Sequence, residues 1–127
     1  MSAFLIMVCF TLPAVSQEGN QKQTIYGKQA AEIIPGAVLV SQMPGDTYPS
    51  SVKFTENSGI TENGFVQWLK TTLKVPSEVD FIMVSSETDN IGFTHQRYIQ
   101  TYKSIPVDRS GYVVQFKNGQ ATSFNGD

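Results

Sequence analysis

The chain has 127 residues, of which 40% are hydrophobic and 16% are charged, and its formal net charge is −2. This length suits one small domain with a single hydrophobic core, and it is too short for two such domains. The lysines are scattered without a block of like charge, so the chain lacks the basic patch that nucleic acid or an anionic membrane surface requires. We therefore expect no nucleic-acid partner.

Residues 1–17 carry no charged side chain and contain an apolar run from Ala3 to Leu12, followed by Pro13 and an Ala-Val-Ser sequence. This pattern is typical of a secretory signal peptide that is cut near Ser16 or Gln17. The run is shorter than the roughly 20 residues that span a bilayer, which argues against a permanent membrane anchor. We expect an exported protein, secreted or periplasmic, that loses its only cysteine, Cys9, with the signal peptide.

The next segment, residues 18–31, is polar and has no steady hydrophobic period, so it is predicted to be a flexible lead-in to a domain at residues 32–127. Two Pro-Gly pairs interrupt residues 32–48, which favours short extended segments over a helix. Residues 51–55 suit a short strand with Val52 and Phe54 on one face.

One amphipathic helix is predicted at residues 60–74, with Thr61 as its N-cap and Pro76 as its stop. Side chains three or four residues apart form its apolar face. These are Phe65, Val66, Trp68, Leu69 and Leu73. An aromatic residue on such a face is interpreted as core, in preference to a ligand-stacking platform.

After the helix the hydrophobic period changes to two, which predicts a strand at residues 79–84, turn chemistry at residues 87–92 and a second strand at residues 93–103. The second strand is predicted to place Tyr98, Gln100 and Tyr102 on one face, with Arg97 on the other. Pro106 offers no N–H and is expected to break the ladder.

A hairpin is predicted at the C-terminal side, where Asn118-Gly119 joins two alternating runs at residues 112–117 and 120–124. The two-residue loop would set Phe116 opposite Ala121 and Val113 opposite Phe124. The expected fold class is α+β, with one amphipathic helix packed on a mostly antiparallel sheet that ends in this hairpin.

Few residues suggest catalysis. His95 is the only histidine and no cysteine would survive export, so a zinc site of the usual composition cannot be built from this chain. The metalloprotease signature H-E-x-x-H, the P-loop and the G-x-S-x-G elbow do not occur in the sequence, and the carboxylates lie singly near turns. We expect no enzyme activity from this chain alone and no cofactor.

Residues 95–107 carry a distinctive run that resembles the motif of the fungalysin/thermolysin propeptide domain, R-Y-x-Q-x-Y-x-G-I/V-P-V. Seven positions match in order and spacing: Arg97, Tyr98, Gln100, Tyr102, Ile105, Pro106 and Val107. Ser104 stands where the motif usually has glycine, and residues 108–110 replace a more glycine-rich link. With the preceding helix, the resemblance covers residues 32–127.

The resemblance implies a module that assists the folding of a secreted zinc metalloendopeptidase and helps keep it inactive, with this chain as the N-terminal part of the precursor. Its partner would be the cognate catalytic domain, which alone would hold zinc. The motif residues Arg97, Tyr98, Gln100, Tyr102 and Pro106 are candidate contacts with that domain. The alternative is a free-standing exported binding or inhibitor module, and a reading frame that continues past Asp127 to H-E-x-x-H would decide for the precursor.

Overall fold

The computed structural model describes residues 21–126 of the chain. The predicted signal peptide at residues 1–17 lies outside the described residues, as does the start of the predicted lead-in, residues 18–20.

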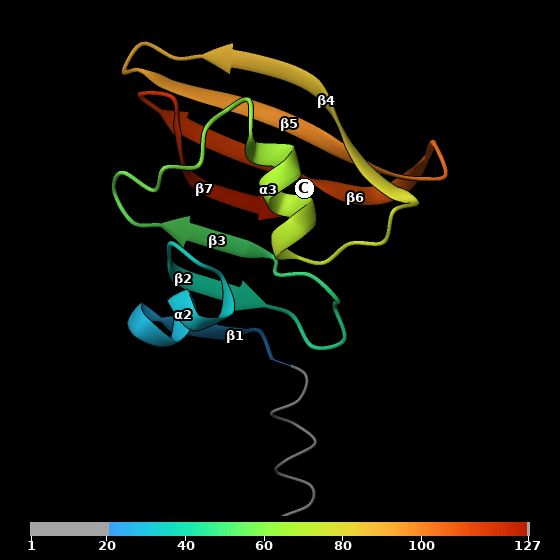
Figure 1. Ribbon diagram of the computed structural model, residues 1–127, viewed down its shortest axis with the longest axis horizontal. Coiled ribbons are helices and arrows are strands. Elements are labelled where there is room, and N and C mark those ends of the chain that lie inside the picture. Colours follow the sequence, from blue (N-terminus) through green and yellow to red (C-terminus); the bar gives the residue numbers. More distant parts are fainter. Residues whose placement is uncertain (1–20, 127) are drawn as a thin grey trace, which may run out of the picture.

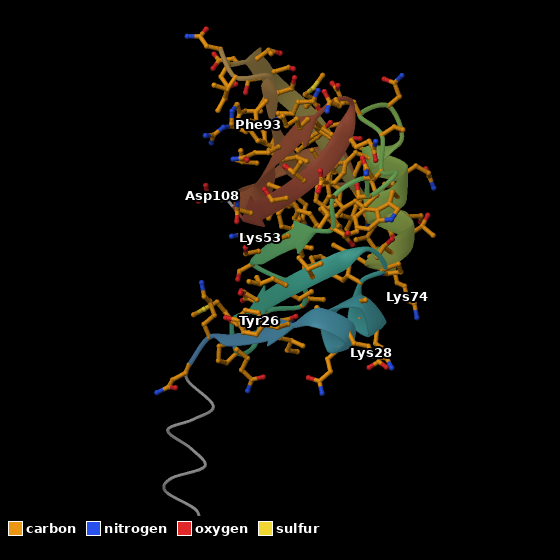
Figure 2. All side chains as sticks on the ribbon, turned by 90° about the vertical axis from the view of Figure 1, so that its left-hand side faces the viewer. Tyr26, Lys28, Lys53, Lys74, Phe93 and Asp108 are labelled. Atoms are coloured by element: carbon orange, nitrogen blue, oxygen red, sulfur yellow. The ribbon has the colours of Figure 1, made fainter. Side chains whose placement is uncertain are left out.

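Seven antiparallel strands form one open sheet in the order β1-β2-β3-β7-β6-β5-β4 (Figure 1). The strands are β1 (Gln23–Tyr26), β2 (Ala37–Gln42), β3 (Ser51–Phe54), β4 (Val79–Thr88), β5 (Phe93–Tyr102), β6 (Ile105–Lys117) and β7 (Gln120–Gly126). Two helices, α2 (Gly27–Ile33) and α3 (Phe65–Thr72), lie on the same side of this sheet (Figures 1 and 2). The structure confirms the predicted α+β class, and two consecutive antiparallel sets, β1 to β3 and β4 to β7, meet where β3 pairs with β7.

The core lies between α3 and the middle of the sheet. Phe65 and Leu69 on α3 are fully buried, as predicted, and the ring of Phe65 contacts those of Tyr98, Phe116 and Phe124 at centroid distances of 5.8–5.9 Å. Aromatic rings at such separations attract one another in tilted and edge-to-face arrangements. The remaining members of the predicted apolar face pack partly buried against this core: Val66, Trp68 and Leu73.

The helix is shorter than predicted because the chain on either side of it is held differently. Thr61 forms an isolated bridge with Gln120, and its hydroxyl accepts a hydrogen bond from the Gly64 N–H at 3.1 Å, so it closes a turn ahead of the helix. Gly64, and not Thr61, is the N-cap. At the other end the helix stops at Thr72, Leu73 is its C-cap, and Lys74 adopts a φ of 54°, so the helix ends before Pro76 is reached.

The predicted flexible lead-in is wrong for residues 23–31, which form β1 and most of α2. The segment is mostly polar, so its composition gave no indication of the few apolar side chains that anchor it. Ile25 pairs with Val40 and packs partly buried against the core, and Ala30 on α2 is fully buried. The hydroxyls of Thr24 and Ser41 are also hydrogen-bonded at 3.0 Å. Tertiary contacts therefore order a segment that has little helix or strand signal of its own.

Pro106 does not break the ladder, contrary to the prediction. It is the second residue of β6 and pairs with Thr101 of β5. Since β7 pairs with β6 only from Tyr112 onward, β5 is the only described strand beside this part of β6. Proline is tolerated in a strand where one side needs no backbone donor.

The C-terminal hairpin is confirmed at its loop and corrected further along. Asn118 and Gly119 have φ values of 54° and 77°, as a type I′ turn requires, and Phe116 lies opposite Ala121. Phe124, however, pairs with Val114 and not with Val113. The extra residue Thr122 makes a bulge, and its hydroxyl donates to the Gln115 carbonyl at 3.1 Å.

Candidate functional site

The five candidate motif residues do not converge on a single site. Tyr98 is buried beneath α3, and its hydroxyl donates to Gln96 Oε1 at 2.7 Å. Arg97 is exposed and pairs in register with Ser85 and Val113 on the face away from α3. Tyr98 is therefore a core residue, whereas Arg97 belongs to the surface.

Gln96 is a residue that the sequence interpretation did not single out. It is buried, and its Nε2 lies 3.2 Å from Glu62 Oε1 and 3.4 Å from Ser86 Oγ. It thereby joins β5 to the chain before α3 and to β4. Burial, aided by the negative charge of Glu62, raises the pKa of Tyr98 above its ordinary value, so this phenol stays protonated at neutral pH and can donate to Gln96. The feature of the sequence that could have identified Gln96 is its position on the same strand face as Tyr98.

Gln100 lines a groove of about 510 Å³ at one end of the sheet. The groove lies between the loop from β2 to β3, the middle of β6, and the ends of β5 and β7. Its lining consists of Asp46, Thr47, Tyr48, Pro49, Ser50, Gln100, Ser110, Gly111, Tyr112 and Gly126. Among these, Tyr112 is buried, and its hydroxyl donates to the Pro49 carbonyl at 3.0 Å. Burial, with smaller effects from Tyr48 and Asp46, strongly raises the pKa of Tyr112, so this hydroxyl remains a donor.

Tyr102 and Pro106 lie at the β5–β6 turn, on the surface. The Tyr102 side chain is 46% exposed, and the Lys103 ammonium lies 5.4 Å from the centre of its ring. Tyr102 pairs with Ile105, which is also exposed, and Pro106 follows. The exposed motif residues Tyr102 and Pro106 therefore lie at one end of the sheet, and the β4–β5 turn lies at the other.

The face of the sheet away from α3 carries a row of polar side chains, and no described helix covers it. Figure 2 shows Tyr26, Lys53 and Asp108 on this side. Strand pairing places one residue from each of five strands in a row across it: Lys53, Ser123, Gln115, His95 and Glu87. An antiparallel sheet with one face in the core and one face in water has this alternation. Arg97 belongs to the neighbouring row of the same face.

His95 Nε2 lies within hydrogen-bonding distance of Asp89 Oδ2, at 2.9 Å, at the turn between β4 and β5. Among residues 21–126 no group of three His, Cys, Asp or Glu side chains is placed to hold a metal ion. Within the same residues, no helix is both long enough and apolar enough to span a membrane.

Acidification is expected to loosen the β4–β5 turn. The His95 hydrogen bond, followed by the N–H groups of Phe93 and Ile91, lowers the pKa of Asp89 below its ordinary value of 3.8. Because the pKa of Asp89 is lower in the folded protein than in the unfolded chain, its carboxylate stabilises the turn fully at pH values above the ordinary pKa. This stabilisation is lost as the pH falls through the lowered pKa. Amide NMR signals of Ile91 and Phe93 should therefore shift in acid.

Asp89→Asn is the control for this turn, because it keeps an acceptor oxygen but does not titrate. Its signals at Ile91 and Phe93 should stay nearly constant over the same pH range. Identical acid titrations in the two proteins would contradict the role given to Asp89.

A helix packed on one face of an open antiparallel sheet, with surface residues presented at the sheet's end and on its free face, defines an α+β domain. Residues 79–127 match the family model described as the Fungalysin/Thermolysin Propeptide Motif, which confirms the resemblance. The match takes in β4 to β7 and all five motif residues, and it is narrower than the resemblance, which reached back to Glu32. No curated protein gives a significant match to this chain.

Proposed function

We propose that this chain is a propeptide module that assists the folding of a secreted zinc metalloendopeptidase and helps keep it inactive. The observation that carries the proposal is the motif match at residues 79–127, a segment characteristic of fungalysin/thermolysin-type precursors. The zinc and the catalytic residues would belong to the catalytic domain. The apolar run at residues 3–12 supports export of the chain.

Binding linkage supplies the mechanism. A module that binds the native or near-native protease, and not its unfolded chain, stabilises the folded protease by mass action. Covalent attachment in a precursor would give the module a high effective concentration, which cleavage would then remove. The module needs no chemistry of its own for either effect.

The motif residues differ in burial, and therefore in the role proposed for each. Tyr98 holds the core beneath α3, so its conservative replacement would act through stability. Arg97 and Tyr102 are exposed and are the better candidates for contact with the catalytic domain. Strand alternation puts them on opposite faces of β5, so a partner that contacts both must reach around the end of the sheet.

Refolding of the cognate catalytic domain provides the test. Added wild-type module is expected to raise the yield of active protease, and the double variant Arg97→Ala/Tyr102→Ala to raise it much less, because the exposed contacts are gone. The module alone should show no peptidase activity with or without added zinc. Yield is measured from protease activity after refolding, once circular dichroism has shown that each module is folded.

The matched control is Lys53→Ala, an exposed residue of β3 outside the segment that matches the family. It should assist refolding as well as the wild type. Equal assistance by the wild type and the double variant would refute the contact assignment. Metal-dependent cleavage by the module alone would overturn the proposed function.

A further inference from the structure

The strand β4 forms one edge of the sheet. This strand of ten residues pairs with β5 on one side, and no described strand lies beyond it (Figure 1). An edge strand of this length presents a row of backbone N–H and C=O groups that an added strand can pair with. The opposite edge, β1, has only four residues. The long edge is therefore the stronger template for strand addition.

Three consecutive apolar side chains are exposed at the centre of this edge. Ile82, Met83 and Val84 are 46%, 51% and 50% exposed, respectively. Val84 is the extra residue of a bulge in the pairing with β5, which turns the strand locally. Lysine and proline, which commonly protect sheet edges, do not occur in β4. An apolar edge without these protections is suited to binding another chain.

The charged residues of β4 and of the segments next to it in sequence have one sign. Residues 75–96 contain four carboxylates and neither Lys nor Arg: Glu78, Asp80, Glu87 and Asp89. Asp80 lies 3.3 Å from the Lys70 ammonium, and Asp89 contacts His95. Glu78 and Glu87 form no ion pair with other described residues, and they flank the apolar centre on either side. An arriving strand with cationic ends would complement them.

In at least one register, a second copy of the chain fits this edge poorly. Antiparallel pairing of two β4 strands about a two-fold axis between Met83 and Val84 would set Asp80 opposite the Glu87 of the other copy, twice per dimer. Like charges directly opposite each other in neighbouring strands destabilise the pairing. In that register, charge favours a different, basic polypeptide over a second copy.

We propose that the outer edge of β4 binds an extended polypeptide segment with an apolar centre and flanking Lys or Arg residues, which adds to the sheet as an eighth strand. Backbone hydrogen bonds would provide the affinity, and the two acidic ends would select the charge of the segment. This binding site is independent of the proposed function, because its test contains no protease.

The probe is the capped nonapeptide KTVTVTVTK, labelled for fluorescence anisotropy and unlabelled for NMR. We expect it to bind the wild-type protein, with amide shifts concentrated on β4, and the acidic counterpart ETVTVTVTE to bind at least about tenfold more weakly. The variant KTVPVPVTK, which cannot donate from two central positions, should lose binding to a similar extent. Equal affinity for the basic and acidic peptides would overturn the proposal.

Variants of the protein locate the site. Ile82→Lys should weaken peptide binding about tenfold, because it places a cation in the apolar centre. Glu87→Lys, at an exposed position outside that centre, should also weaken binding of the basic peptide, and it provides a second test if the first variant folds poorly. Gln23→Lys on the opposite edge, β1, is the matched control and should bind as the wild type does. Amide shifts on β1 or on the open face, or self-association that Ile82→Lys abolishes, would refute a basic segment at β4.

Discussion

Replacing Leu69 with alanine is expected to lower the free energy of unfolding by about 2–5 kcal/mol. Leu69 is fully buried on α3, and its side chain fills the core between that helix and the sheet. Truncation leaves a cavity that the surrounding rings cannot fully occupy. Small domains have only about 5–15 kcal/mol of stability in total, so the loss should move the urea midpoint far toward zero.

Leu73→Ala is the matched control on the same helix. Leu73 is the C-cap residue and is only partly buried, so its truncation should cost distinctly less than that of Leu69. Both are measured by urea unfolding followed by circular dichroism. Equal losses at the two positions would show that the buried face of α3 has been assigned wrongly.

Gly111→Ala is expected to cost more than about 4 kcal/mol, or to prevent folding altogether. Gly111 lies opposite Ile99 in β6 with a φ of 153°, and a Cβ added there would overlap the backbone carbonyl oxygen of Tyr98. Backbone atoms of a paired strand cannot rotate away as a side chain can. The two strands would have to separate where the motif segment is held.

Gly92→Ala is the control that distinguishes the cost of this atomic overlap from the cost of placing alanine at a positive φ. Gly92 also has a positive φ, of 92°, but open space surrounds the position of its missing Cβ. Its replacement should cost only about 1–2 kcal/mol. If the thermal midpoints of the two variants fell equally, close approach of β6 to β5 would not be the reason that position 111 is glycine.

Local chemistry made part of this fold predictable. Asn118-Gly119 determines a hairpin loop through two adjacent residues, and the apolar face of α3 repeats within a few turns, so both could be predicted from short stretches of sequence. The segment of β1 and α2 could not, because a few small apolar contacts with distant strands order it. The Thr122 bulge also changed the pairing beyond Phe116, and alternation alone gives no sign of an extra residue.

The candidate site was predictable in composition but not in exposure. Spacing identified the motif residues, and alternation correctly put Tyr98 and Tyr102 on the same strand face. It did not reveal that Tyr98 is covered and Tyr102 is not, because α3 packs over the middle of the sheet and leaves its end open. Exposure of Met83 on β4 was hidden for a related reason, since it alternates with the buried Val79 and Phe81 and such a run usually indicates one buried face.

The position of β7 between β3 and β6 has a consequence for synthesis of the protein. The strands β4 to β7 pair in chain order and can form as neighbours emerge, as can β1 to β3. The two sets join only when Lys53 meets Ser123, a contact across most of the chain that is entropically costly and slow to form. A nascent chain that has not yet released residues 120–126 from the ribosome therefore holds two unjoined half-sheets, each with an open edge.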